Sequence, residues 1–265
     1  MKPSVLLKHV ARRHSEVADR LKGELASEAH NQTDVNKWIV CAMVTARSSD
    51  YVAACTVLTA QRHSEAAMGL ARTVLEDAAV LGYIASKKKQ ADFAELYGQS
   101  DILDRAKMQK QMVKMRPELE AKHKDELARW RKMADDYVAR GAQLGLWPAE
   151  KEFDRLRSWN DRTLRDSFDK AGMGLVYDTW YSECCQFSHA SAFALSRGFV
   201  DTLPMDDPVR TAAADGLPDR VRQILALGLF YQLKAVNDLT GCQPSDGLNA
   251  LEQFLQEALA ETRDK

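Results

Sequence analysis

The chain has 265 residues, with 37 Lys and Arg against 38 Asp and Glu, so its formal net charge is −1. This balance argues against a protein that coats DNA through charge alone, because phosphate binding needs a surplus of basic side chains. The 13 glycines and 7 prolines are few for this length. Long regular elements joined by few turns are therefore expected, rather than a sandwich or a barrel.

The sequence gives little indication of a targeting signal, a membrane span or a reactive cysteine pair. Charged side chains follow only a few apolar ones at the N-terminus, which disfavours a signal peptide. The longest apolar runs, 78–85 and 224–231, fall far short of the ~18 residues of a membrane span. The five cysteines are scattered without a C-x-x-C pair, so we expect buried thiols, with a redox disulfide between Cys184 and Cys185 as the alternative. The sequence predicts a cytoplasmic protein that does not enter a membrane.

Apolar residues recur at helical spacing along almost the whole chain, and no alternating strand of useful length is present. The pattern predicts a single all-α domain over 1–265, a helical bundle of about eight or nine helices. Ser4, Asp34 and Ser64 are expected N-caps, and whether the second helix restarts near Asp50 stays open. In chain order, the predicted helices are 4–29, 34–59, 64–86, 91–115, 117–139, 161–171, 176–197, 219–239 and 247–261.

Two segments stand apart from this bundle. Residues 104–136 are dense in both charge signs, which predicts a long projecting helical hairpin over 90–141. Its surface is either a solvated face or the docking surface for a protein partner or a second copy of the chain. Residues 198–220 hold three of the seven prolines. A turn-rich stretch of this length is expected to be either a functional lid or a disordered connecting segment.

The helix predicted over 64–86 carries a polar stripe. At about 100° per residue, the polar side chains of the stripe fall within about a quarter of the circumference of this helix, and the rest of the helix is apolar. A helix of this kind is buried, so Arg72 and Glu76 are expected inside the bundle or at the floor of a cleft. The alternative is an ordinary surface ion pair at i,i+4 spacing. The members of the stripe are Glu65, Gly69, Arg72, Glu76 and Tyr83.

A second stripe lies on the helix predicted over 176–197. Its members step by four residues and therefore share one face, with Ser188 projecting between the two tyrosines. Histidine is the side chain best suited to proton transfer near neutral pH, and the tyrosine hydroxyls can orient it or a substrate. The alternative is a structural histidine whose hydrogen bonds are made within the core. The stripe consists of Tyr177, Tyr181, Cys185 and His189.

Motifs for cofactors and metals are missing. The sequence has no Walker loop, dinucleotide fingerprint, H-E-x-x-H helix or G-x-S-x-G elbow. Bundles that hold two irons use Glu-x-x-His on two helices, and His189 has no glutamate three residues before it. We therefore expect no cofactor and no metal.

The two polar stripes and the residues around them resemble a bacterial family known as domain of unknown function 5677. The resemblance lies in ARTVLEDAAVLGYI, in WNDRTLRDSFDKAG and in 177–191, and it spans roughly 35–200. It implies an all-helical bacterial protein without an established activity. Cys185 departs from the pattern, because the family usually has serine there. The motif residues that the resemblance carries over are Arg72, Glu76, Tyr181 and His189.

A looser similarity is to helical ribonucleases of bacterial toxin–antitoxin and phage-defence systems, which place Arg-x(4–6)-His on one helix. This chain departs from that pattern, because Arg72 would supply the cation from another helix. The interpretation is an internal site for RNA or a small anionic ligand, in which Arg72, Glu76, Tyr181 and His189 act as catalytic groups of a metal-independent ribonuclease. The alternative is a non-catalytic interaction module that uses the charged hairpin. The expected ligand-binding residues are Tyr83, Tyr177, Cys185 and Ser188.

Overall fold

The structure is a computed structural model that describes residues 2–26, 34–188 and 216–260, and every regular element within them is helical. The prediction of an all-α helical bundle is confirmed. In chain order the elements are α1 (Pro3–Ala26), α2 (Val35–Ala60), α3 (Ser64–Ala85), α4 (Gln90–Gly98), α5 (Asp101–Met115), α6 (Glu118–Lys122), α7 (Lys124–Gln143), η1 (Phe153–Arg155), α8 (Leu164–Lys170), α9 (Gly174–Val176), η2 (Tyr177–Tyr181), α10 (Ser182–Ser188), α13 (Leu217–Thr240) and α14 (Leu248–Ala260).

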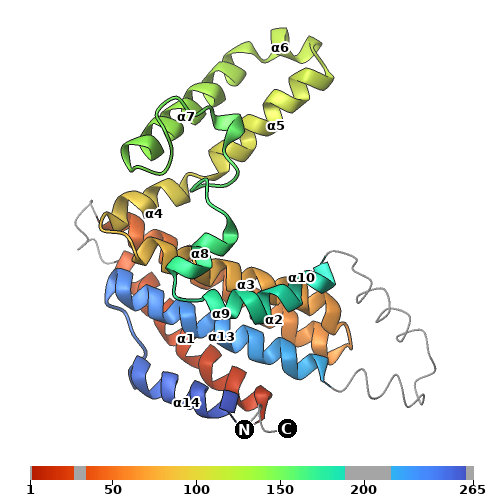
Figure 1. Cartoon of the computed structure of the whole chain (residues 1–265), viewed down its shortest axis with the longest axis vertical. Helices are drawn as coiled ribbons and strands as arrows, with labels where there is room; N and C mark the ends of the chain where they lie inside the picture. Colours follow the sequence, from red (N-terminus) through yellow and green to blue (C-terminus); the bar gives the residue numbers. More distant parts are fainter. Residues whose placement is uncertain (1, 27–33, 189–215, 261–265) are drawn as a thin grey trace, which may run out of the picture.

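Helix α3 lies at the centre of the bundle. It contacts α2 and α13 along its length, and α8 and α10 cover another side (Figure 1). The sequence of α3 is apolar around most of its circumference, which explains this position. A helix of this kind exposes least apolar surface to water when other helices surround it. Gly228 allows α13 to approach α3, since a Cβ at this position would lie 2.8 Å from Cγ1 of Val74.

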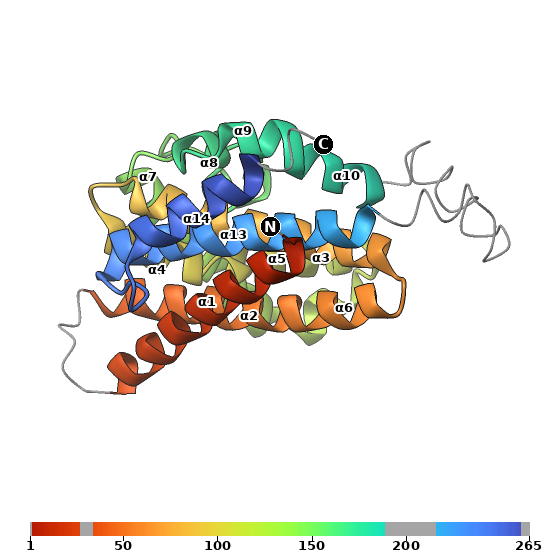
Figure 2. The same cartoon turned by 90° about the horizontal axis from the view of Figure 1, so that it is seen from below.

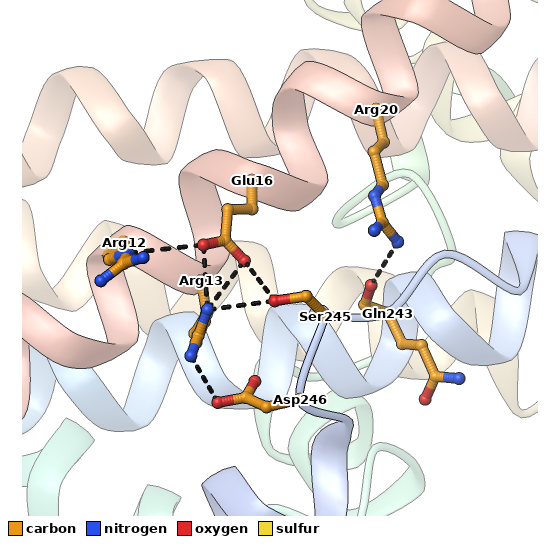
Figure 3. A network of polar contacts seen from close by, with 7 residues as sticks. All are labelled: Arg12, Arg13, Glu16, Arg20, Gln243, Ser245 and Asp246. Carbon is orange, nitrogen blue, oxygen red and sulfur yellow. Dashed lines mark hydrogen bonds and ion pairs between the residues drawn. The ribbon is translucent and has the colours of Figure 1, made fainter.

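Helix α1 crosses the bundle obliquely and packs against α2 and α13 (Figure 2). Arg13 joins it to the loop before α14, donating to Ser245 Oγ at 3.1 Å and to Asp246 Oδ2 at 2.5 Å (Figure 3). Arg20 donates to the carbonyl oxygen of Gln243 at 3.0 Å. These contacts fix the start of α14 to the N-terminal helix, more than 200 positions away in the chain.

The hairpin differs from its prediction at its base. The helix predicted over 91–115 is broken after Gly98, because α4 buries Phe93 and Leu96 and packs against α2. Only α5, α6 and α7 project from the bundle (Figure 1). The predicted second arm is also divided, into α6 and α7. Residue Pro117 is the N-cap of α6, directly before its first helical residue.

Several helix boundaries are now settled. Helix α2 runs without interruption through Asp50, and Asp34 occupies its N-cap position without a side-chain capping hydrogen bond. Ser4 and Ser64 lie inside α1 and α3, so neither is the predicted cap. Helix α8 begins only at Leu164, because Thr163 forms a capping box with Asp166.

The helix predicted over 176–197 is not one regular helix where it is described. It comprises α9, a five-residue π-helical turn (η2) and α10, and its predicted end lies outside the described residues. Most of the 198–220 segment is also outside them. Helix α13 begins at Leu217, with Pro218 in its first turn. Arg220 is paired with Glu183 at 2.9 Å and lies over the Trp180 ring, so α13 begins beside η2 and α10.

Two further predictions concern the environment of the chain. No helix in the described ranges combines the length and the apolar character that a bilayer crossing requires. Three cysteines are buried and two are partly exposed, and all five are free thiols. Burial raises the pKa of Cys41 and of Cys55 to about 12, which keeps both as neutral thiols.

Candidate functional site

Three of the four predicted catalytic side chains meet at one point. Arg72 Nε donates to Glu76 Oε1 at 2.9 Å and to the hydroxyl oxygen of Tyr181 at 3.0 Å. The Tyr181 hydroxyl in turn donates to the same Glu76 oxygen at 2.7 Å. The guanidinium carbon of Arg72 also lies 5.2 Å from the centre of the Tyr181 ring. We call these three residues the Arg72 cluster.

The Arg72 cluster is only partly buried. The side chains of Arg72 and Glu76 are 24% and 30% exposed, so the pair does not lie fully inside the bundle. Burial works against the charge of Arg72, but Glu76 and Tyr181 hold its pKa above the ordinary value. The pKa of Tyr181 is raised by burial and by the hydrogen bond to Glu76. Tyr181 therefore stays protonated and acts as a hydrogen-bond donor.

An aromatic stack holds Tyr181 in place. The rings of Tyr177 and Tyr181 are stacked with centroids 5.0 Å apart, and Phe168 of α8 packs against both. The two tyrosines are the first and last residues of the π-helical turn. This turn has an i to i+5 hydrogen-bond pattern, and such turns occur often at functional sites. The periodicity of the sequence does not reveal this turn. The predicted stripe assumed a regular α-helix with four-residue steps, and the π-helical turn interrupts that helix between Tyr177 and Tyr181.

The structure describes the remaining residues of that stripe to different extents. Cys185 is partly buried in α10 and lies close enough to Tyr181 to contribute to its raised pKa. Ser188 is the last residue of α10, and its side chain is not among the described ones. His189 lies outside the described residues. Its predicted convergence with Arg72 therefore stays a prediction.

Tyr83 is part of the core and not of the Arg72 cluster. It is buried, packs edge-on against Trp159 with centroids 5.5 Å apart, and lies beneath Lys87. Within the described parts of the chain it makes no contact with Arg72 or Tyr181. Its position on the predicted stripe follows from helix periodicity, but the stripe extends two turns beyond the cluster.

A second Arg–carboxylate–Tyr cluster, which the sequence analysis missed, begins at the next residue of α3. Arg47 of α2 donates to both carboxylate oxygens of Asp77, from Nε at 3.1 Å and also from Nη2. Arg47 also donates to the hydroxyl oxygen of Tyr97 at 3.3 Å, and Ser48 donates to Asp77 at 3.4 Å. The Asp77 side chain is 4% exposed, and burial raises its pKa to about 6 although Arg47 and Ser48 act against this.

A chain of buried polar groups continues from this second cluster. Gln232 of α13 donates to Ser48 Oγ at 2.8 Å and to the carbonyl oxygen of Val74 at 3.1 Å. Its Oε1 lies 3.0 Å from Nε2 of His14. Because Gln232 Oε1 can only accept, His14 Nε2 must carry the proton. Burial lowers the pKa of His14 to about 4, so the ring is neutral near pH 7.

The charged and polar sequence neighbours of His14 favour a solvated ring, but the ring is buried. The residues three and four positions away include Val10, Val17 and Ala18, which are buried. Helix periodicity therefore gave the right signal, and the sequence neighbours misled. Asp77 carries the same signal, because Val74 and Leu81 lie three and four positions from it on the buried face.

The chemistry available to the Arg72 cluster follows from these contacts. A partly exposed guanidinium can bind an oxyanion, and Glu76 with the neutral Tyr181 fixes its orientation. No group of three metal-ligating side chains occurs among the described residues. The cluster therefore offers a positive charge in a fixed position beside an aromatic wall, because the Tyr181 hydroxyl already donates its proton to Glu76.

Comparison with known proteins gives one match. A model of a family of unknown function (DUF5677) matches residues 38–207, which include most of α2, all of α3, the hairpin and the whole Arg72 cluster. No curated protein and no solved structure matches the chain. The looser ribonuclease resemblance finds no support in these comparisons. Since the match covers well over half of the sequence, the chain belongs to the family of unknown function DUF5677.

Proposed function

We propose that the Arg72 cluster is a binding site for a small anionic group, such as the phosphate of a nucleotide or of RNA. The supporting observation is that Arg72 and Tyr181, 109 positions apart, are joined through a shared Glu76 oxygen. A surface ion pair at i,i+4 spacing needs no third partner from a distant segment. A guanidinium held in one orientation binds an oxyanion with a smaller loss of conformational freedom.

The reaction that this site would serve is metal-independent RNA cleavage, in a role in stress or phage defence. His189 would take the proton of a 2′-hydroxyl, and the 2′-oxygen would attack the adjacent phosphorus. The bond from phosphorus to the 5′-oxygen would break, and this oxygen would take a proton from water. Arg72 would stabilise the charge that builds up on the phosphate oxygens. Tyr181 and Glu76 would be positioning residues for Arg72.

Cleavage of total RNA by the purified chain in EDTA tests the enzymatic proposal. We expect His189→Ala and Arg72→Ala each to reduce cleavage by about 100-fold or more. Lys132→Ala is the matched control, because it breaks an exposed i,i+4 ion pair with Asp136 far from the site. Absence of cleavage by the intact chain would overturn the nuclease proposal.

Anion binding is tested separately with inorganic phosphate. We expect phosphate to raise the melting temperature of the intact chain in a saturable way, and Arg72→Ala to abolish this increase. Far-UV circular dichroism establishes that the variant is folded. An equal response of both proteins would contradict the binding proposal even if cleavage were observed.

The second candidate function is an interaction module based on the hairpin. Three methionines at i, i+4 and i+7 spacing on α5 have exposed side chains, and Met-rich helical faces are typical of adaptable protein-binding surfaces. This proposal is favoured if Met112→Glu removes a partner that co-purifies with the chain and leaves RNA unaffected. Self-association lost in the same variant would identify a second copy as the partner. The three residues are Met108, Met112 and Met115.

A further inference from the structure

The hairpin and η1 line a cavity of about 230 Å³ that is open to solvent on one side, between α5, α6, α7 and η1. Trp130 of α7 and Phe153 of η1 provide aromatic walls. Pockets for drug-sized ligands have volumes of roughly 300–1,000 Å³, so this cavity suits a smaller occupant, on the order of one fused ring system. The cavity is formed entirely by the hairpin and η1, separately from the Arg72 cluster.

Gln109 gives this cavity a specific polar group. Its Oε1 atom is buried and accepts no hydrogen bond from any described residue. Its amide nitrogen likewise makes no hydrogen bond within the described part of the chain. A buried acceptor without a donor is unfavourable, and nearly all such groups in native proteins have a partner. A ligand that brings an N–H or O–H group into the cavity would satisfy this acceptor.

Charges at the rim of the cavity are balanced. Lys110 is paired with Asp154, which leaves Arg131 and Glu120 as one cation and one anion. A rim without net charge does not favour an anionic ligand over a neutral one. Recognition therefore depends on the aromatic walls and the carboxamide of Gln109.

We propose that the hairpin cavity binds the adenine base of a nucleoside or nucleotide. A glutamine carboxamide pairs with the N6 and N7 edge of adenine through one accepted and one donated hydrogen bond, and this satisfies Gln109 Oε1. Guanine presents two acceptors on the same edge and leaves Oε1 without a donor. Trp130 and Phe153 supply aromatic rings on which a base stacks, and the cations of Arg105 and Lys110 lie over these two rings.

Isothermal titration calorimetry of the full chain with adenosine tests this site. We expect saturable binding at one site, binding of adenosine monophosphate within about threefold, and binding of guanosine at least 10-fold weaker. Gln109→Leu should weaken adenosine binding at least 10-fold, because it replaces the pairing edge with an apolar branched side chain of similar volume. Gln111→Leu is the matched control, because Gln111 is exposed on the same helix.

Folding is monitored through the melting temperature. Gln109→Leu removes an unsatisfied acceptor, so it should leave the melting temperature equal or higher. Equal affinity for adenosine and guanosine would overturn the proposal, as would unchanged adenosine binding in Gln109→Leu. Failure of the intact chain to bind adenosine at millimolar concentration would also overturn it. Because the probe carries no phosphate, these outcomes are independent of anion binding at Arg72.

Discussion

The hydroxyl of Tyr181 donates a hydrogen bond of 2.7 Å to Glu76 Oε1, an oxygen that also accepts from Arg72. Tyr181 comes from a π-helical turn 105 positions after Glu76. A distant third partner distinguishes the Arg72 cluster from a two-residue helical ion pair such as Lys132–Asp136, and the Arg13–Glu16 pair shares this feature through Ser245. Three further sets of experiments examine the energetics of this cluster, of the second cluster and of the central packing.

Arg72→Ala should lower the free energy of unfolding by about 1–2 kcal/mol. The loss is larger than for an exposed ion pair, because Tyr181 and Glu76 both lose a charged partner in a partly buried place. It is smaller than the ~3–5 kcal/mol expected for a fully buried pair, because 24% of the Arg72 side chain is exposed. Urea unfolding measures the change. The exposed pair broken by Lys132→Ala should change stability by less than about 0.5 kcal/mol. An equal effect of both variants would mean that the third partner adds nothing.

Tyr181→Phe should lower the free energy of unfolding by about 1 kcal/mol, because it removes one hydroxyl and leaves the stacked ring in place. Combined with Glu76→Gln, the effects should not be additive, because the two groups share a hydrogen bond. Tyr51→Phe is the control, since the Tyr51 hydroxyl makes no hydrogen bond within the described residues. Additive effects in the double-mutant cycle would show that the two side chains are energetically independent.

Two buried groups should give opposite pH dependence of stability. The pKa of Asp77 is raised from 3.8 to about 6, so its contribution is fully present below pH 3.8 and is lost as the pH rises through 6. The pKa of His14 is lowered from 6.5 to about 4, so its contribution is present above pH 6.5 and is lost as the pH falls through 4. In the intact chain the two slopes oppose each other between pH 4 and 6.5.

Single substitutions separate these two slopes. In Asp77→Asn, the free energy of unfolding should rise by about 2 kcal/mol between pH 4 and 6.5, because the His14 slope remains. In His14→Gln it should fall by about the same amount over this range, because the Asp77 slope remains. Urea unfolding at half-unit pH steps measures both. Identical pH profiles for the two variants would contradict the assignment of the raised pKa to Asp77 and of the lowered one to His14.

Gly228→Ala should destabilise the protein by about 1–3 kcal/mol, because the new methyl group would overlap with Val74 at the contact between α13 and α3. Gly23→Ala is the matched control. A Cβ at Gly23 meets nothing within 4 Å, and alanine is the better helix former, so this variant should gain about 0.5–1 kcal/mol. Thermal unfolding followed by circular dichroism compares the two. A neutral Gly228→Ala would show that α13 and α3 can separate without loss.

The sequence by itself determined the helical class, the central place of α3 and the pairing of Arg72 with Glu76. All three depend on the 3.6-residue period, which places side chains four positions apart on one face. The same period contained the burial of His14 and Asp77, although the charged and polar sequence neighbours of His14 suggested a solvated ring.

Tertiary structure alone decided which distant groups meet. The π-helical turn brings Tyr181 to Glu76, and α2 brings Arg47 to Asp77, because packing of α3 against its neighbours fixes the relative rotation of these helices. The break after Gly98 has the same origin, since burial of Phe93 against the bundle outweighs the continuous helical propensity of 91–115. Local periodicity specifies the face on which a side chain lies, and only the packed helices specify what lies opposite.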